Sequence, residues 1–406
     1  MEKIVGVVAE YNPFHRGHRY QIQEIRARCK DAGIVVALSS SFLQRGVPAL
    51  LDKWIRAEMA VLCGADLVLE LPVPFCCNNA GVFAGGAVKL LKATGVVGAL
   101  SFGMEDRTDL LGTIPAILVQ EPPAFKTILQ EFLEKGHSYA EARAQAAEAC
   151  CPGAAELLGK PNNTLAFAYA EAALREKAGL EMLPLQRVGA GYHDRSSSPV
   201  MSAAGIREAL ASGREDAAFA AMPEASARLL RGAMERGRCR LDDKPLWTAL
   251  RLLLTRCDAQ ELARYAEISE GIENRFLSQY GSCESFGELA AKVATRRYPL
   301  TRVQRQLTYL LLHITKEDNR TFQARGPAYI RPLAMNERGR EILRLMRKRS
   351  ALPVVTKPSA LKGNFYAQKI LDLEFRAAAI WESFLPCPDC RHEVLAAPAL
   401  VEGELE

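Results

Sequence analysis

The sequence predicts an α/β fold, with a parallel sheet in the N-terminal half and a mainly α-helical C-terminal region. Short apolar runs alternate with helical stretches over the first two hundred residues, and beyond residue 213 the pattern is almost entirely helical. Unbroken apolar strands separated by helices are typical of doubly wound parallel sheets. With 406 residues the chain is too long for one small module, and we expect two domains, 1–215 and 216–406.

The elements of the first half follow one another as strand and helix. Strands are expected at 4–9, 33–38, 65–71, 96–102 and 183–188. Helices are expected at 18–30, 54–63, 80–93 and 202–212, with a further helical stretch between 109 and 177. This order predicts consecutive βαβ units, whose ligand site lies beyond the carboxyl ends of the strands.

Composition argues against secretion and membrane insertion. The longest apolar stretch, 59–77, is interrupted by Asp66, Glu70, Pro72 and Pro74, which excludes a transmembrane helix. The first residues run directly into a strand, so no signal peptide is expected. Eleven cysteines without framework spacing indicate reduced thiols. We expect a cytoplasmic protein with no membrane partner.

Positive charge is concentrated in one part of the chain. Residues 292–349 hold fifteen Lys or Arg against four Asp or Glu, a balance of +11, so the rest carries −6 of the net +5. A basic segment of this kind favours a polyanionic partner. The alternative is a set of arginine-rich helices that are simply solvated.

Two histidines stand directly after the first expected strand, in the run Ala-Glu-Tyr-Asn-Pro-Phe-His-Arg-Gly-His that covers 9–18. Gly17, between His15 and His18, allows a phosphate to approach the backbone at the helix start. The imidazoles are then placed to donate to phosphate oxygens during phosphoryl or nucleotidyl transfer. The alternative is a pair of surface histidines at a helix N-terminus.

This run resembles the HIGH motif of the nucleotidyltransferase superfamily, and 201–207 is similar to that superfamily's second motif, with some hydroxyls replaced by alanine. The match narrows to the bacterial tRNA(Met) cytidine acetate ligase family. The segments that carry this resemblance are 10–15, 42–46, 53–56, 66–72, 102–103, 160–163, 191–194, 292–305 and 328–331.

The resemblance implies a Rossmann-like nucleotidyltransferase domain that activates acetate with ATP to acetyl-adenylate. It also implies transfer of the acetyl group to the wobble cytidine of elongator tRNA(Met), which forms N4-acetylcytidine. His15 and His18 are the expected catalytic residues. Mg²⁺ is expected with the triphosphate, although the sequence does not identify its ligands.

The ATP site implied by the resemblance comprises the first turn and three later positions. Its members are Val7, Val8, Ala9, Glu10, Tyr11, Asn12, Pro13, Phe14, His15, Arg16, Gly17, His18, Arg19, Tyr20, Gly103, Asn162 and Arg187. Asn163 is an equally eligible neighbour of Asn162. Arg207, in the weaker second motif, is a candidate phosphate contact.

The expected tRNA contacts are basic residues from two regions: Arg45, Lys53, Arg296, Arg297, Arg302 and Arg305. Val303, Leu307, Leu310 and Leu311 give the later segment an apolar helical face, so its arginines can project outward to phosphates. For Arg45, an ordinary surface position is an equal alternative. For Lys53, contact with pyrophosphate is an alternative to contact with tRNA.

Two other functions remain open from the sequence alone. One is a small-molecule nucleotidyltransferase, against which the extra two hundred residues and the basic segment argue. The other is a noncatalytic RNA-binding protein with a nucleotide pocket, against which both intact histidines argue. Cys387, Cys390 and His392 lack the second ligand pair that structural zinc requires, so no metal site is expected.

Overall fold

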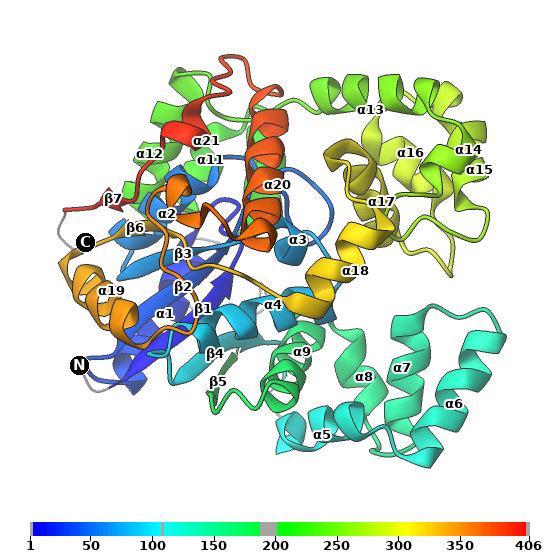
Figure 1. Cartoon of the computed structure of the whole chain (residues 1–406), viewed down its shortest axis with the longest axis horizontal. Coiled ribbons are helices and arrows are strands. Elements are labelled where there is room, and N and C mark those ends of the chain that lie inside the picture. The colour runs from blue at the N-terminus through cyan, green and yellow to red at the C-terminus, as the bar shows by residue number, and fades with distance from the viewer. Residues whose placement is uncertain (1–2, 107–108, 187–200, 403–406) are drawn as a thin grey trace.

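A seven-stranded sheet, in the order β5-β4-β1-β2-β3-β6-β7, forms the centre of the molecule (Figure 1). The computed structural model describes residues 3–106, 109–186 and 201–402. The strands are β1 (Ile4–Ala9), β2 (Gly33–Ser39), β3 (Leu67–Leu71), β4 (Ala99–Met104), β5 (Glu181–Gln186), β6 (Pro332–Met335) and β7 (Ala399–Leu400). All five strands predicted from the sequence are present within two or three residues of their expected bounds.

Strands β1 to β5 are parallel, with Val7 opposite Val36 of β2 on one side and Ser101 of β4 on the other. Their carboxyl ends therefore meet at one edge of the sheet. Strand β6 pairs antiparallel with β3, and β7 pairs parallel with β6.

The two faces of the sheet are covered by different helices, and each face has its own apolar core. On one face Val5, Val36 and Val68 pack against helices α1, α2, α10 and α12. On the other face Val35, Leu69 and Phe102 pack against α4, α9 and α19. The bounds of these helices are α1 (Arg16–Arg28), α2 (Lys53–Leu62), α4 (Ala80–Ala93), α9 (Pro161–Arg175), α10 (Ala203–Ala211), α12 (Glu224–Glu235) and α19 (Glu337–Arg349).

Two groups of helices extend from the same side of the sheet domain (Figure 1). The first helical lobe consists of α5 (Thr113–Gln120), α6 (Pro123–Glu134), α7 (Tyr139–Glu148) and α8 (Ala154–Gly159). The second helical lobe consists of α13 (Lys244–Arg256), α14 (Ala259–Leu262), α15 (Ile272–Gln279), α16 (Phe286–Val293), α17 (Leu300–Leu312) and α18 (Lys316–Arg325).

The remaining elements are short, except for one long helix near the C-terminus. They are α3 (Val73–Cys76), α11 (Glu215–Ala220), α20 (Phe365–Glu382), α21 (His392–Leu395) and three 3₁₀ turns at Asp109–Leu111, Tyr280–Ser282 and Pro358–Leu361. Among the described residues, no helix combines the length and apolar character that crossing a bilayer needs.

The predicted fold class is confirmed: a doubly wound sheet is followed by a mainly helical region. The two parts are more interlaced than a division at residue 215 implies, because β6 and β7 come from the C-terminal region and extend the N-terminal sheet. Strand β6 has four residues and begins with proline, which is too short a run to stand out as a strand in the sequence. It covers the backbone edge that β3 would otherwise expose.

Candidate active site

His15 and His18 lie side by side at the carboxyl end of β1, where α1 begins. His15 is the N-cap of α1: its Nδ1 accepts a hydrogen bond from the backbone N–H of Gly17 (3.0 Å). The backbone N–H of His15 in turn donates to Nδ1 of His18 (3.3 Å), which completes a reciprocal capping box. The two rings stack with their centroids 3.8 Å apart and an angle of 23° between their planes. The structure thus brings together the two residues predicted to be catalytic.

These hydrogen bonds select the tautomer of both imidazoles. Because Nδ1 of each ring is an acceptor, the proton of each neutral ring is on Nε2. Each ring therefore has an N–H donor on the nitrogen that points away from its capping contact. Two imidazole donors at a helix N-terminus are suited to bind the non-bridging oxygens of a phosphate.

The backbone before the histidines is held by two arginines. Arg56, fully buried at the start of α2, donates to the carbonyl oxygens of Glu10 (2.6 Å), Ser40 (2.7 Å) and Leu51 (3.1 Å). Burial lowers its pKa to about 10. It therefore ties together the carboxyl ends of β1 and β2. Nothing in the sequence around Arg56 marks it as buried.

Arg207, in α10, donates to the carbonyl oxygen of Asn12 (2.6 Å). Burial is the largest influence on its guanidinium and lowers its pKa. The side chain of Asn12 accepts from the backbone N–H of Leu50 (2.7 Å), and the carboxylate of Glu10 accepts from that of Gln44 (2.9 Å). The turn between β1 and α1 is thus fixed on several sides before any ligand binds.

Most of the predicted ATP-site run 7–20 lies at this edge, but its side chains differ in access. Val7, Tyr11, Asn12 and Phe14 are buried, and His15 is 6% exposed. Arg16 and Tyr20 are exposed, and Gly17 and His18 are partly exposed. The run can therefore present backbone groups and the histidine donors to one ligand.

Gly103 and Asn162 lie near the same edge. Gly103 is the penultimate residue of β4, and Asn162, at the start of α9, donates through its side-chain amide to the Glu105 carboxylate. Asn163 is fully buried and bonds the backbone N–H of Glu105 (2.9 Å) and the carboxylate of Asp106 (2.8 Å). The amide of Asn163 is therefore committed to the fold. Arg187 lies outside the described residues.

Lys53 is not on the surface, so its predicted contact with tRNA is wrong. Its side chain is 1% exposed, and its Nζ forms ion pairs with three carboxylates, those of Glu70, Glu374 (3.0 Å) and Glu393 (2.9 Å). Burial alone would lower the pKa of Lys53, but these carboxylates outweigh it and raise the pKa. Two of the three partners come from the last forty residues, which no local pattern connects to Lys53.

Arg305 is also buried, and its predicted contact with tRNA is wrong for the same reason. Its side chain is 7% exposed and pairs with Glu267 (3.3 Å). Gly46, in the loop after β2, packs directly on this part of α17: its φ is +74°, and a Cβ there would lie 2.4 Å from the backbone nitrogen of Arg305. Thr308 also donates to the carbonyl oxygen of Gly46 (2.8 Å). The loop that carries Arg45 thus docks the second helical lobe on the sheet domain.

The other four predicted tRNA contacts are accessible. Arg45 is exposed on that loop. Arg296 and Arg297 are more than half exposed and pair with Glu141 (3.0 Å) and Glu270 (2.8 Å), and Arg302 stacks on the ring of Tyr298 (4.5 Å to its centroid). The Arg296 pair joins the second helical lobe to α7 of the first.

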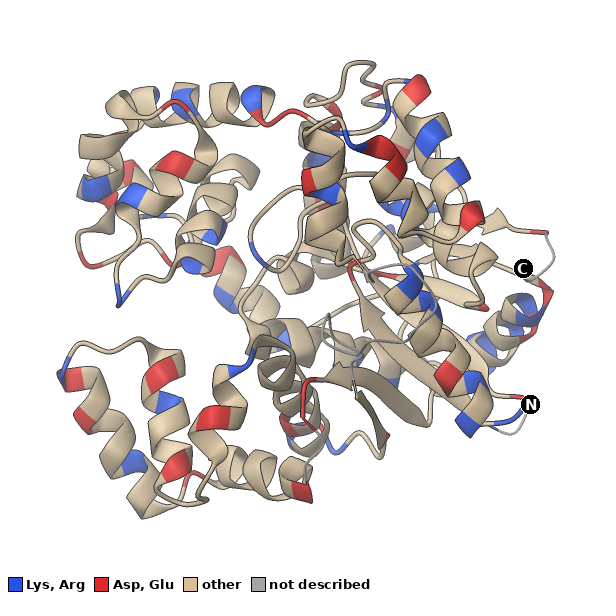
Figure 2. Ribbon diagram, turned by 180° about the vertical axis from the view of Figure 1, so that it is seen from behind, with Lys and Arg blue, Asp and Glu red and all other residues tan. Residues whose placement is uncertain are grey.

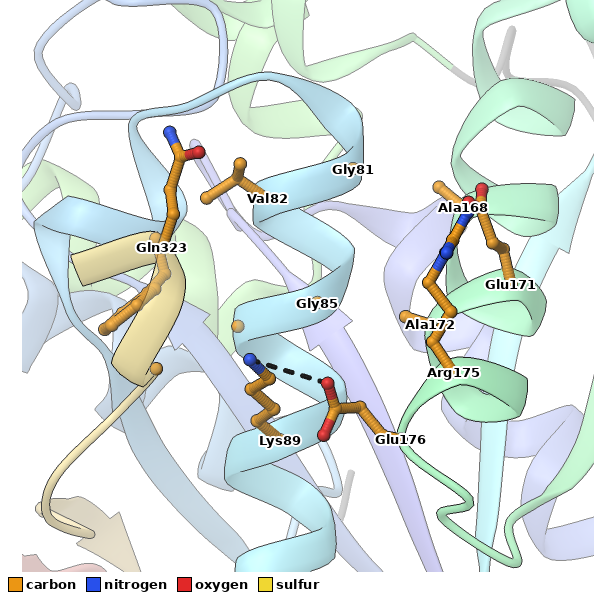
Figure 3. Close-up of a pocket in the computed structure, with 13 residues that line it drawn as sticks. Gly81, Val82, Gly85, Lys89, Ala168, Glu171, Ala172, Arg175, Glu176 and Gln323 are labelled. Carbon is orange, nitrogen blue, oxygen red and sulfur yellow. Dashed lines mark hydrogen bonds and ion pairs between the residues drawn. The ribbon is translucent and has the colours of Figure 1, made fainter. Parts of the chain in front are cut away.

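A cavity of about 300 Å³ lies away from the histidines, between α4, α9 and α18 (Figure 3). Small residues such as Gly85 and Ala168 line it, and Lys89 and Glu176 form an ion pair at its side (3.4 Å). None of its lining residues belongs to the predicted ATP site.

Metal-binding chemistry is sparse in the parts of the chain that the structure describes. They contain no group of three or more His, Cys, Asp or Glu arranged to hold a metal ion. Cys387 and Cys390 are exposed free thiols.

A doubly wound sheet with a His-x-Gly-His turn after its first strand defines a HIGH-type nucleotidyltransferase, and the model of the HIGH Nucleotidyl Transferase family matches residues 2–393. The tRNA(Met) cytidine acetate ligase of Syntrophomonas wolfei is 35% identical over 403 residues, covering 96% of each chain. That of Clostridium perfringens is 31% identical, covering 98% of this chain and 99% of its own. The chain belongs to the tRNA(Met) cytidine acetate ligase family.

Solved structures agree with this assignment. The crystal structure of Thermotoga maritima TmcAL bound with alpha-thio ATP has a TM-score of 0.90 and 31% identity, with 98% of this chain and 99% of that chain covered. The apo form of the same protein has a TM-score of 0.91. The resemblance predicted from the sequence is confirmed.

Proposed function

We propose that this protein is an ATP-dependent ligase that acetylates the wobble cytidine of elongator tRNA(Met). The observation that carries the proposal is the stacked pair of His15 and His18, held as Nε2–H donors at the carboxyl edge of the sheet. Relatives named for this reaction match the chain along almost its whole length. Because the substrate is a tRNA, a cytoplasmic location belongs to the same proposal.

The reaction has two steps. In the first, a carboxylate oxygen of acetate attacks the α-phosphorus of ATP, and the bond to the bridging oxygen breaks to release pyrophosphate. In the second, the exocyclic amine of cytidine attacks the acetyl carbon of the adenylate, and AMP leaves as the amine loses a proton. Acetate needs this activation because a free carboxylate is a poor acyl donor.

The histidines act in the first step. Negative charge grows on the phosphate oxygens and on the leaving pyrophosphate as the attack proceeds, and the two Nε2–H groups donate to those oxygens. Their fixed tautomer and stacking mean that the donors need no reorganisation during the step. The N-terminal amides of α1 add a favourable field at the same place.

The ATP site that we propose consists of the run 7–20 with Gly103, Asn162 and Arg187. Asn162 is preferred to Asn163 because Asn163 is fully buried, whereas Asn162 is partly exposed. Arg207, bonded to the carbonyl oxygen of Asn12, keeps further N–H groups for a phosphate. We propose that Mg²⁺ arrives with ATP, liganded mainly by phosphate oxygens and water, since the described residues contain no metal-binding cluster.

The tRNA contacts that we propose are Arg45, Arg296, Arg297 and Arg302. Three of them lie on the second helical lobe, where acidic and basic residues alternate along the ribbon (Figure 2). Their carboxylate partners are themselves partly exposed, so exchange of a carboxylate for an RNA phosphate costs little. Their contacts with phosphates would anchor the anticodon arm while the wobble base leaves its stack.

Exchange of labelled pyrophosphate into ATP tests the first step. We expect exchange that requires acetate and proceeds without tRNA, because activation comes first. Labelled acetate should enter tRNA only when ATP is present. Exchange that depends on a phosphorylated metabolite, with acetate inert, would instead identify a small-molecule nucleotidyltransferase. Absence of any exchange together with tight tRNA binding would identify a noncatalytic RNA-binding protein.

A further inference from the structure

Helix α19 carries a strongly basic surface that is separate from the second helical lobe. Its thirteen residues include six Lys or Arg and two Glu, a balance of +4. Lys and Arg recur along this helix beside the two chain ends in Figure 2. The basic segment recognised in the sequence, 292–349, is therefore divided by the fold between two distant surfaces.

Two arginines of α19 differ in their partners from the arginines predicted to bind tRNA on the second helical lobe. On the second helical lobe, Arg296, Arg297 and Arg305 are all paired with glutamates. On α19, Arg344 and Arg347 are exposed, and neither side chain has a hydrogen bond or ion pair with any described residue. Unpaired guanidinium groups are the ones that can bind an external anion without first losing an internal contact.

A groove of about 590 Å³ runs beside these arginines. Arg340, Arg344, Arg347 and Thr356 supply its polar side, and Leu343 and Leu400 are among its apolar residues. Arg340 also pairs with Glu337 (2.7 Å), which holds its guanidinium near the first turn of α19. A basic rim over an apolar floor suits a nucleotide, whose phosphate needs cations and whose ribose and base need a surface to pack against.

The groove lies at the opposite edge of the sheet from the histidines. Asn336, the N-cap of α19, donates to the carboxylate of Asp66 (3.2 Å), just before β3 begins. Gly339 packs so closely on this point that a Cβ would lie 2.0 Å from the carbonyl oxygen of Asp66. The amino ends of the strands are therefore the ones that α19 adjoins, whereas His15 follows the carboxyl end of β1.

We propose that the groove along α19 binds an RNA segment of the tRNA substrate outside its anticodon arm. This inference rests on the proposed function, which places the anticodon loop at the carboxyl edge of the sheet. A groove at the other edge cannot serve the same loop, but an RNA that extends beyond its anticodon stem can reach it. Arg344 and Arg347 bind phosphates, and the apolar floor takes an unpaired nucleotide.

The test compares two RNAs: full-length unmodified elongator tRNA(Met) and its isolated anticodon stem-loop. Affinities are measured by fluorescence anisotropy over a range of salt concentrations. The test variant is Arg344→Glu/Arg347→Glu, and the matched control is Arg344→Lys/Arg347→Lys, which keeps both charges. Acetate-dependent pyrophosphate exchange is measured for every variant, because it reports folding and the ATP site without RNA.

We expect the glutamate variant to bind full-length tRNA about 10-fold or more weakly, with a log–log salt slope about two units smaller. Its affinity for the stem-loop and its pyrophosphate exchange should match the wild type, and the lysine variant should bind both RNAs nearly normally. Equal affinity of wild type and glutamate variant for full-length tRNA would overturn the proposal. Equal weakening for both RNAs would overturn the placement outside the anticodon arm.

Three further outcomes are distinguishable. If the glutamate variant does not fold, Arg344→Gln/Arg347→Gln removes the charges without introducing repulsion. The salt dependence of its affinity for full-length tRNA then tests the proposal: an unchanged slope would overturn it. Binding of anionic phospholipid vesicles that needs these arginines, with unchanged tRNA affinity, would overturn the proposal in favour of a membrane surface. Failure of the proposed function would appear in the wild type itself, as absent acetate-dependent exchange, whatever the α19 variants do.

Discussion

Nζ of Lys53 lies 3.0 Å from Oε2 of Glu374, which follows it by 321 residues in the chain. The surrounding cluster contains the carboxylates of Glu70, Glu374 and Glu393 and the cations of Lys53 and Arg331, all buried. With three acids and two bases away from water, the cluster favours one protonated carboxyl group. Burial, reinforced by the charge of Glu70, raises the pKa of Glu374 to about 7.

Stability should therefore depend on pH through Glu374. In the unfolded chain its pKa is about 4.3, so between that value and about 7 the folded protein holds a proton that the unfolded chain has lost. The stability contributed by this group is complete below the lower value and is lost as pH rises through the higher one. We expect the free energy of unfolding of Glu374→Gln, measured by urea titration, to lack this decline.

An exposed carboxyl group provides the control for that experiment. Glu341→Gln, on the surface of α19, should leave the pH dependence of the wild type unchanged. Glu393 does not confuse the result: burial acts on it too, but Lys53 and Arg331 outweigh burial and lower its pKa, so its contribution is lost only at more acidic pH. A wild-type stability that rises between about pH 5 and 7, relative to Glu374→Gln, would contradict the assignment.

Alanine at His15 or His18 should reduce acetate-dependent pyrophosphate exchange by about 100-fold or more. Each substitution removes an Nε2–H donor and one bond of the capping box, so a loss of stability of about 1 kcal/mol is also expected. ATP affinity should change much less than turnover. His313→Asn is a suitable control, because His313 has a φ of 54°, which asparagine tolerates. Near wild-type exchange by the double alanine variant would remove these residues from catalysis.

Arg56→Met should destabilise the protein by about 3 kcal/mol or more, because the carbonyl oxygens of Glu10, Ser40 and Leu51 lose their donor inside the fold. Arg56→Lys has one donor group in place of three and should recover part of the loss. Thermal unfolding measures the stability. Pyrophosphate exchange, measured below the unfolding transition, shows whether the β1–α1 turn still supports the reaction. Unchanged melting of Arg56→Met would show that the three carbonyl bonds are not needed.

Arg296 and Glu141 provide a matched pair for tRNA binding. Arg296→Gln removes both the ion pair with Glu141 and any phosphate contact, whereas Glu141→Gln removes that ion pair and the contact of Glu141 with His137 (2.8 Å) but keeps the arginine's charge. If Arg296 binds tRNA, filter binding should show weaker affinity for Arg296→Gln, by a few-fold to about 10-fold, and normal or slightly higher affinity for Glu141→Gln. Equal loss in both variants would mean that the contact between the helical lobes, and not the arginine's charge, supports binding.

The sheet was predictable because the parallel strands are mainly apolar runs that alternate with helices. Strand β1 is buried on both faces, and the β1–α1 turn carries its chemistry in adjacent residues. Strands β6 and β7 have four and two residues, too few for a period to appear. Their place is decided by the free edge of β3, which is a property of the assembled sheet.

The contact between His15 and His18 was predictable, because both residues stand in one short run directly after the first strand. The burial of basic residues was not predictable, because their charge alone suggested a surface position. Lys53 and Arg305 look like surface cations in the sequence, but each has a partner in another segment, Glu374 for Lys53 and Glu267 for Arg305. A cation can be buried only if a carboxylate or several carbonyl oxygens contact it in the folded protein. No local sequence pattern predicts such contacts.

Strand β6 has a consequence for the way the protein is made. The sheet begins with β1, at residues 4–9, and β3 ends at residue 71, but the strand that covers β3 is synthesised only after residue 331. Until then the β3 edge is open to other chains, and Lys53 lacks Glu374 and Glu393. A nascent or prematurely ended chain thus has His15 and His18 but an unfinished sheet, and an open strand edge of this kind is what a chaperone protects.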